Sequence, residues 1–287
     1  MDTVLTSRSK TVTIGIDKPF CIIGERINPT GRKAFAAELR EGDLTTVIAD
    51  VEAQVAMGAD VLDVNAGIPF VDEPAMLARM IKLVQEHCDL PICIDSSVVE
   101  ALEAGLAVYE GKALVNSVTG EDERMELILP IVAKHKAAVI ALTNDETGIP
   151  ETAAKRLEIA RKIVGTCGEH GIPPEDIVID PLALTVGADT EAVNVTLKTM
   201  SMIRDELGVN MSLGASNVSF GLPGRHQLNA AFLAMAMSHG LTSAIMNALA
   251  EECVEIVRAA DLMLGKDPWG ANWISRYRAR QAATAPA

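Results

Sequence analysis

Carboxylate and amide side chains recur along this chain at the points where short apolar runs end. Residues in such positions are Glu25, Asn28, Asp63, Asn65, Asp95, Asn116, Asp180, Asn217 and Asn247. A carboxylate accepts hydrogen bonds from N–H groups, and a primary amide both donates and accepts them. A site lined by such groups suits a neutral heterocycle with several N–H donors and a lactam, as in a pterin or a guanine-like ring.

The same residue types have ordinary structural uses. Asp, Asn and Ser cap helices and close turns, so about half of the set is expected to do only that. Carboxylates also bind sugars, but stacked sugar rings need aromatic side chains, which make up only 3% of this chain. The sequence contains no glycine-rich phosphate loop, no serine nucleophile elbow and no Lys at the end of an apolar run that could form a Schiff base.

The order of the chain indicates which elements bring these residues together. Eight apolar runs alternate with stretches of helical periodicity. Each helical stretch is long enough to connect two parallel strands. The runs predicted as strands cover 20–24, 61–67, 91–97, 113–117, 138–144, 177–181, 211–214 and 243–247. This alternation predicts an α/β fold, a single-domain (β/α)8 TIM barrel, whose strands all end at one mouth.

The two ends of the chain do not fit this alternation. Residues 1–19 are predicted to form an arm laid across the bottom of the barrel, residues 20–267 the barrel itself, and residues 268–287 a C-terminal tail. The tail spaces Trp269, Trp273 and Tyr277 by about one helical turn. It packs either on the outside of the barrel or on a second subunit, and the sequence leaves that choice open.

Composition excludes several classes of function. The net charge of −14 over 287 residues would repel a phosphate backbone, so nucleic acid is not expected as a partner. No apolar run is long enough to span a membrane and no signal peptide pattern is present, so we expect a cytoplasmic protein. The five Cys and five His show no metal-binding spacing, so no protein-bound metal is expected.

Six short motifs in this order resemble one known family. They are GERIN at 24–28, DVNAG at 63–67, IDS at 94–96, VNS at 115–117, IDP at 179–181 and GASNVS at 214–219. Together they resemble the methyltetrahydrofolate:corrinoid protein methyltransferases of the pterin-binding superfamily, which is related to dihydropteroate synthase and to the folate domain of cobalamin-dependent methionine synthase. The resemblance covers about residues 20 to 265.

The resemblance implies roles for individual residues. Asp95, Asn116 and Asp180 match positions that hydrogen-bond the pterin edge, and Asn217 matches the catalytic amide beside N5, the atom that carries the methyl group. Gly214, Ser216 and Arg225 match positions that help to hold the folate. Glu25, Asn28, Asp63 and Asn65 also match family positions, and whether they contact the ligand or only support the site stays open.

The resemblance also implies an activity and partners. The substrate would be tetrahydrofolate or 5-methyltetrahydrofolate, and the other methyl carrier would be a corrinoid on a separate protein, because no cobalamin-binding motif is found. A homodimer acting in one-carbon metabolism is expected. A non-catalytic pterin-binding subunit is the alternative. Dihydropteroate synthase is a weaker alternative, because its Lys and Ser-x-Arg elements are missing near the last two strands.

Overall fold

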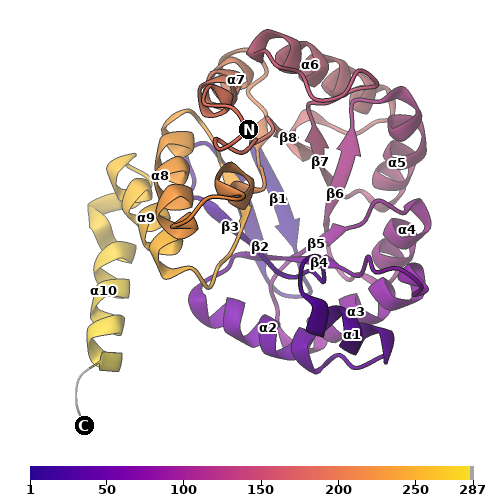
Figure 1. Cartoon of the computed structure of the whole chain (residues 1–287), viewed down its shortest axis with the longest axis horizontal. Helices are drawn as coiled ribbons and strands as arrows, with labels where there is room; N and C mark the ends of the chain where they lie inside the picture. The colour runs from indigo at the N-terminus through magenta and orange to yellow at the C-terminus, as the bar shows by residue number, and fades with distance from the viewer. Residues whose placement is uncertain (285–287) are drawn as a thin grey trace.

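Eight parallel strands form the centre of the computed structural model, which describes residues 1–284, and helices surround them (Figure 1). The strands are β3 (Cys21–Ile27), β4 (Val61–Asn65), β5 (Ile92–Asp95), β6 (Leu114–Thr119), β7 (Ala138–Leu142), β8 (Ile177–Asp180), β9 (Asn210–Met211) and β10 (Ser243–Met246). Their order is β10-β3-β4-β5-β6-β7-β8-β9. Ile245 N donates to Leu213 O at 2.9 Å and so joins the last segment to the seventh. The predicted (β/α)8 barrel is confirmed.

Helices connect consecutive strands and cover the outside of the barrel. They are α1 (Lys33–Arg40), α2 (Thr45–Met57), α3 (Glu73–His87), α4 (Val99–Val108), α5 (Asp122–His135), α6 (Ala153–Glu169), α7 (Ala192–Glu206), α8 (Arg225–Ser238), α9 (Glu251–Met263) and α10 (Ala271–Thr284). Three short 3-10 turns are η1 (Pro174–Asp176), η2 (Ala215–Ser219) and η3 (Pro268–Gly270). No helix among the described residues is long and apolar enough to cross a bilayer.

The seventh strand differs from its prediction. The apolar run predicts a strand over 211–214, but β9 holds only Asn210–Met211, and Gly214 forms a single bridge to Ile245. The reason is that the neighbouring strand β8 ends at Asp180. The last hydrogen bond between the two segments runs from Ser212 N to Ile179 O at 3.0 Å. The chain then turns directly into η2.

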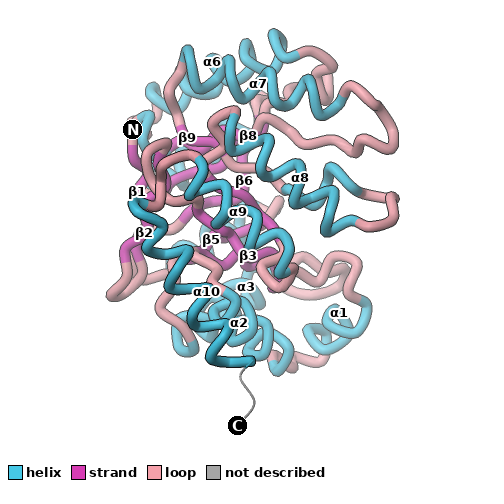
Figure 2. The backbone as a smooth tube through the Cα atoms, turned by 90° about the vertical axis from the view of Figure 1, so that its left-hand side faces the viewer, coloured by secondary structure: helices cyan, strands magenta, loops and turns pink. Residues whose placement is uncertain are grey.

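The N-terminal residues form an antiparallel hairpin of β1 (Asp2–Thr6) and β2 (Thr11–Gly15). Leu5 and Ile14 are fully buried and join the cluster that fills the inside of the barrel. Figure 2 shows the hairpin at one end of the barrel and the loops that follow the barrel strands at the other. The hairpin therefore covers the amino-terminal end, and the opposite end is left for the strand-end side chains.

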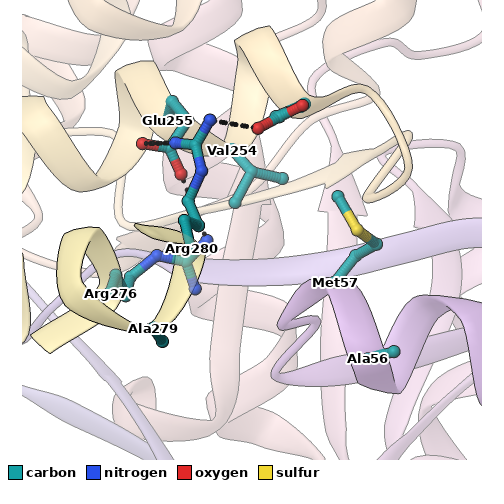
Figure 3. Close-up of a pocket in the computed structure, with 8 residues that line it drawn as sticks. Ala56, Met57, Val254, Glu255, Arg276, Ala279 and Arg280 are labelled. Carbon is teal, nitrogen blue, oxygen red and sulfur yellow. Dashed lines mark hydrogen bonds and ion pairs between the residues drawn. The ribbon is translucent and has the colours of Figure 1, made fainter. Parts of the chain in front are cut away.

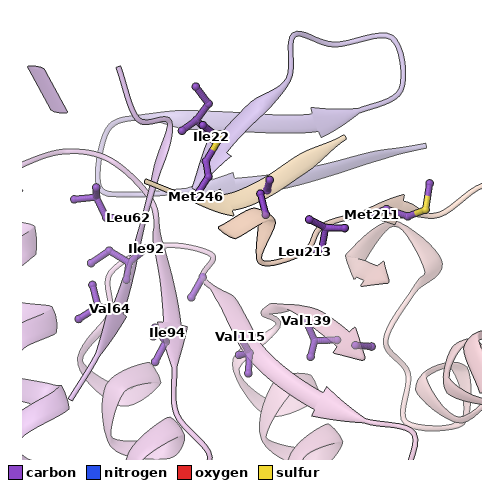
Figure 4. Packing of buried hydrophobic residues seen from close by; sticks show 14 of the residues in the cluster. Ile22, Leu62, Val64, Ile92, Ile94, Val115, Val139, Met211, Leu213 and Met246 are labelled. Carbon is purple, nitrogen blue, oxygen red and sulfur yellow. The ribbon is translucent and has the colours of Figure 1, made fainter. Parts of the chain in front are cut away.

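Alternation along each strand separates two cores. Leu62, Val64, Ile92 and Ile94 point outward and pack beneath the helices (Figure 4). Val61 belongs instead to the cluster inside the barrel. Because successive side chains of a strand point to opposite faces, residues two apart share a face. Asp63 and Asn65 on β4, and their counterparts on the other strands, therefore point into the barrel.

The C-terminal tail packs on the outside of the barrel. Arg276 Nη2 lies 3.4 Å from Glu255 Oε1, and Arg280 Nη1 lies 2.7 Å from Glu255 Oε2, which ties α10 to α9. Trp269 is 97% exposed and Tyr277 58% exposed. The described part of the tail thus lies on its own barrel; the predicted tail also includes 285–287, which lie outside the described residues.

Candidate functional site at the barrel mouth

Three strand ends lie level with one another at the mouth of the barrel. The register of the sheet pairs Asn65 with Asp95 and Asp95 with Asn116. Since all three point inward, the parallel pairing sets an amide, a carboxylate and an amide in a row. All three side chains are partly buried, which leaves polar atoms open to the mouth.

Side chains of β4 are hydrogen-bonded to the next two strands of the sheet, β5 and β6. Asn65 Nδ2 donates to Asp95 Oδ2 at 2.9 Å, and Asn116 Nδ2 donates to Asp63 Oδ1 at 3.2 Å. Asn65 Oδ1 accepts from Gly67 N at 2.8 Å. Asp63 lies one layer deeper than Asn65 and is 1% exposed. The structure thus brings together four of the predicted site residues.

Asp180 reaches the mouth from β8 and is held by the loop that follows it. Its Oδ1 accepts a hydrogen bond from Leu182 N at 2.7 Å. The loop is fixed by Arg156, a residue of α6 that is 1% exposed. Arg156 Nη1 donates to Pro181 O and to Leu182 O, both at 2.8 Å. The buried guanidinium therefore fixes the backbone beside Asp180.

The turn after β9 is joined to the first barrel strand. Ser216 Oγ donates to Glu25 Oε1 at 3.0 Å. Arg225 Nη2 donates to Ser216 O at 2.7 Å, and Arg225 Nε donates to Ser219 Oγ at 3.1 Å. These bonds hold η2 against the mouth from both sides.

Asn217 lies in the middle of this turn and is exposed. A Cβ atom added to Gly214 would lie 3.0 Å from Asn217 Nδ2, so the glycine allows a close approach of the amide to the backbone. The side chain therefore lies against Gly214, which bridges to Ile245.

Besides Asn65, two of the candidate amides close turns. Asn28 Oδ1 accepts from Thr30 N at 2.9 Å, and Asn247 Oδ1 accepts from Leu249 N at 3.0 Å. Each bond runs from the side chain to the amide two residues on, which is the Asx-turn expected of Asn at the start of a loop. The structural use predicted for part of the set is thus found at these positions.

Burial makes the mouth carboxyls hard to ionise. Burial raises the pKa of Asp180 to about 7, while the hydrogen bond from Leu182 and the charge of Arg156 oppose the shift. Burial also raises the pKa of Glu25, against the hydrogen bond from Ser216. These shifts follow from removing a charge from water with few cations nearby.

Asp63 and Asp95 influence each other in the same way. Burial, and then the nearby Asp95 carboxyl, raise the pKa of Asp63 well above its usual value. Burial raises the pKa of Asp95 to about 6, with Glu73 adding to the shift and the Asn65 amide opposing it. Groups with shifted pKa values in a cleft are typical of functional sites.

Sequence reasoning missed two residues that shape the site. Arg156 lies on the core face of α6 with Ile159 and Ala160. A charged residue among the apolar positions of a predicted helix could have indicated a buried, hydrogen-bonded arginine. Gln54 on α2 is fully buried, and its Oε1 accepts from Arg26 N at 3.0 Å. A Cβ atom on Gly24 would lie 2.4 Å from that oxygen, so a larger residue there would displace the Gln54 amide.

Two further features bear on what the mouth can hold. Among residues 1–284 no group of three or more His, Cys, Asp or Glu is arranged to hold a metal ion. The pocket drawn in Figure 3 is elsewhere, since it is lined by α2, α9 and α10, with Met57, Val254 and Arg280 among its residues. The mouth itself offers carboxylate and amide acceptors with some donors, as a nitrogen-rich ring requires.

Comparisons with known proteins agree with this arrangement. A model of the family described as pterin binding enzyme matches residues 24–247. A protein named methylcorrinoid:tetrahydrofolate methyltransferase from Eubacterium limosum is 32% identical over 263 residues, which cover 90% of this chain and 96% of that protein.

Solved structures of similar shape are dihydropteroate synthases. The Xanthomonas albilineans enzyme with 4-aminobenzoic acid has a TM-score of 0.70 at 18% identity and covers 92% of this chain and 98% of its own. The Yersinia pestis enzyme with a pterine-sulfa conjugate has a TM-score of 0.69 at 14% identity and covers 91% of this chain and 98% of its own. At such identities the likeness shows the fold alone.

Proposed function

This chain belongs to the pterin-binding enzyme family, and we infer from its 32% identity to a methyltransferase of that kind that it transfers methyl groups between tetrahydrofolate and a corrinoid protein. The resemblance that the motifs carry is confirmed by the family match together with the methyltransferase that is 32% identical. The methyl group would move between N5 of the folate and the cobalt of a corrinoid carried by a separate protein. We place the enzyme in the cytoplasm, as a homodimer in one-carbon metabolism.

The observation that carries this proposal is the row of inward polar side chains at the strand ends. Asp95, Asn116 and Asp180 point into one mouth from three strands, and their oxygens would accept the N–H groups of a pterin edge. Gly214, Ser216 and Arg225 would line the opposite side, beside η2. A flat ring held between the two sides would present N5 to Asn217.

Asn217 is the residue we assign to the chemical step. When the methyl group leaves N5, the bonding electron pair stays on nitrogen, which makes the folate a poor leaving group unless N5 is protonated or hydrogen-bonded. A donor whose bond strengthens as charge develops lowers the barrier and adds to the rate more than to binding. The exposed Asn217 amide can give such a bond because it projects from a backbone turn fixed by Ser216 and Arg225.

The test is methyl transfer with purified components. The protein is mixed with 5-methyltetrahydrofolate and free cob(I)alamin, and loss of the cob(I)alamin absorbance is followed with time. Transfer that depends on the protein supports the proposal. Folate binding by calorimetry without transfer, to free cob(I)alamin or to a corrinoid protein, would instead indicate a non-catalytic pterin-binding subunit. Product formation with 4-aminobenzoate and a pterin pyrophosphate would indicate a dihydropteroate synthase.

A further inference from the structure

We propose that strand β4 does not contact the pterin, and that its two inward polar residues, Asp63 and Asn65, are positioning residues for Asn116 and Asp95. This inference rests on the proposed function, in which Asn116 and Asp95 bind the ring edge. It separates the mouth into residues that contact the ligand and residues that set the direction of those contacts.

Asp63 fixes the amide of Asn116. Its Oδ1 accepts from Asn116 Nδ2 at 3.2 Å. At 1% exposure, Asp63 lies too deep to reach a ligand in the mouth. With Nδ2 turned toward Asp63, the planar amide must turn Oδ1 the other way. Asn116 is thereby presented to the ring as an acceptor.

Asn65 fixes the carboxyl of Asp95 and has little capacity left for a ligand. Its Nδ2 donates to Asp95 Oδ2 at 2.9 Å and its Oδ1 accepts from Gly67 N at 2.8 Å. One Asp95 oxygen is thus occupied, and the other is left for a ligand. Like Asp63, Asn65 uses its polar atoms within the protein, so the two residues of β4 act in the same manner on two neighbouring strands.

The groups around Asp95 make the Asn65 amide important for the ionisation of Asp95. Asp63 from β4, Glu73 from α3 and Cys93 from β5 all lie near it, and Glu25 from β3 acts on Asp63. The carboxyls among these groups oppose ionisation of Asp95, whereas the Asn65 N–H favours it. A carboxylate accepts stronger hydrogen bonds than a neutral carboxyl, so Asn65 favours the form of Asp95 that binds N–H groups best.

The first experiment measures Asp95 directly in the ligand-free protein. The protein is labelled with ¹³C-aspartate, and the Asp95 carboxyl resonance is assigned by its loss in Asp95→Asn. Asn65→Leu and Asn65→Ala both remove the donor without adding a charge. Both variants should raise the titration midpoint of Asp95 by about 1 pH unit or more, the effect of one charge-assisted hydrogen bond.

A matched control separates positioning from general support. Asn247→Ala removes another amide of the mouth, one that closes a turn and is not bonded to Asp95. It should leave the Asp95 midpoint unchanged. An unchanged midpoint in both Asn65 variants would overturn the assignment of Asn65, whatever happens to the melting temperature. This readout needs no folate, so it stands even if the proposed function fails.

The second experiment asks whether Asp63 affects folate binding through Asn116. Tetrahydrofolate dissociation constants are measured by calorimetry for Asp63→Asn, Asn116→Ala and the double variant. If Asp63 acts through Asn116, Asp63→Asn weakens binding several-fold in the wild-type background and has no effect in the Asn116→Ala background. An equal loss in both backgrounds would make Asp63 a ligand contact and overturn the proposal. Absence of folate binding in the wild type would instead refute the proposed function.

Discussion

Ser216 Oγ donates a 3.0 Å hydrogen bond to Glu25 Oε1, which joins the turn after the seventh strand to the end of the first. The two residues are 191 positions apart in the chain. The bond spans the mouth wall next to Asn217, and it connects the residue we assign to catalysis with the rigid sheet.

Loss of this bond should loosen the turn. We expect Ser216→Ala to lower the free energy of unfolding by about 1–2 kcal/mol, because the half-buried Glu25 carboxyl then lacks its donor. Urea unfolding measures the change. Ser216→Thr, which keeps a hydroxyl, should recover most of the stability. Equal free energies of unfolding for Ser216→Ala and the wild type would show that the hydrogen bond makes no net contribution to stability.

Asn217→Ala tests the proposed catalytic amide. We expect methyl transfer to fall by about 10²-fold or more, the usual cost of losing one transition-state donor, while the folate dissociation constant changes less. Stopped-flow mixing with cob(I)alamin gives the rate and calorimetry gives the binding. Asn194→Ala, an exposed amide on α7, is the control and should transfer at the wild-type rate. Wild-type rates in Asn217→Ala would remove Asn217 from the chemical step.

The fold was predictable because it follows from local pattern. Apolar runs bounded by turns, each followed by a helix-length stretch, leave few alternatives to a barrel, and a strand-end Asp such as Asp95 or Asp180 is visible in the sequence. The seventh strand was overestimated because β8 ends at Asp180, so the chain after Ser212 has no further partner on that side.

The partners of the site residues were not predictable in the same way. That Asn65 bonds to Asp95 depends on the register between two strands, and that Arg156 holds the loop after Asp180 depends on how α6 packs. Neither follows from spacing along the chain. The exposure of Asn217 likewise results from the short turn η2, whose geometry the motif does not reveal.

Arg156 should be essential for stability. Replacing it with Met leaves the buried carbonyl oxygens of Pro150 and Pro181 without their donor, and leaves Leu182 O with the Thr196 hydroxyl alone. We expect Arg156→Met to lower the free energy of unfolding by about 3 kcal/mol or more. Arg161→Met on the exposed side of the same helix is the control, and it should change stability by less than about 1 kcal/mol. Similar losses in the two variants would contradict the role of Arg156.

Asp180 should make the stability of the ligand-free protein depend on pH. Its pKa is about 7 in the folded protein against 3.8 for an unperturbed Asp. Between these values the folded state binds more protons than the unfolded state, so the contribution of Asp180 to stability is full below about pH 4 and is lost as pH rises through 7. Asp180→Asn has no ionisable group at this position, so the variant does not lose this stability as the pH rises.

The variant should therefore gain stability over the wild type at pH 8 but not at pH 4, by up to roughly 4 kcal/mol if the whole shift is expressed. Urea unfolding at the two pH values measures the difference, and the other mouth carboxyls cancel because both proteins contain them. Folate binding at pH 8 should weaken several-fold in the same variant, since a charge-assisted hydrogen bond becomes a neutral one. A stability difference that is the same at both pH values would show that Asp180 titrates normally in the fold.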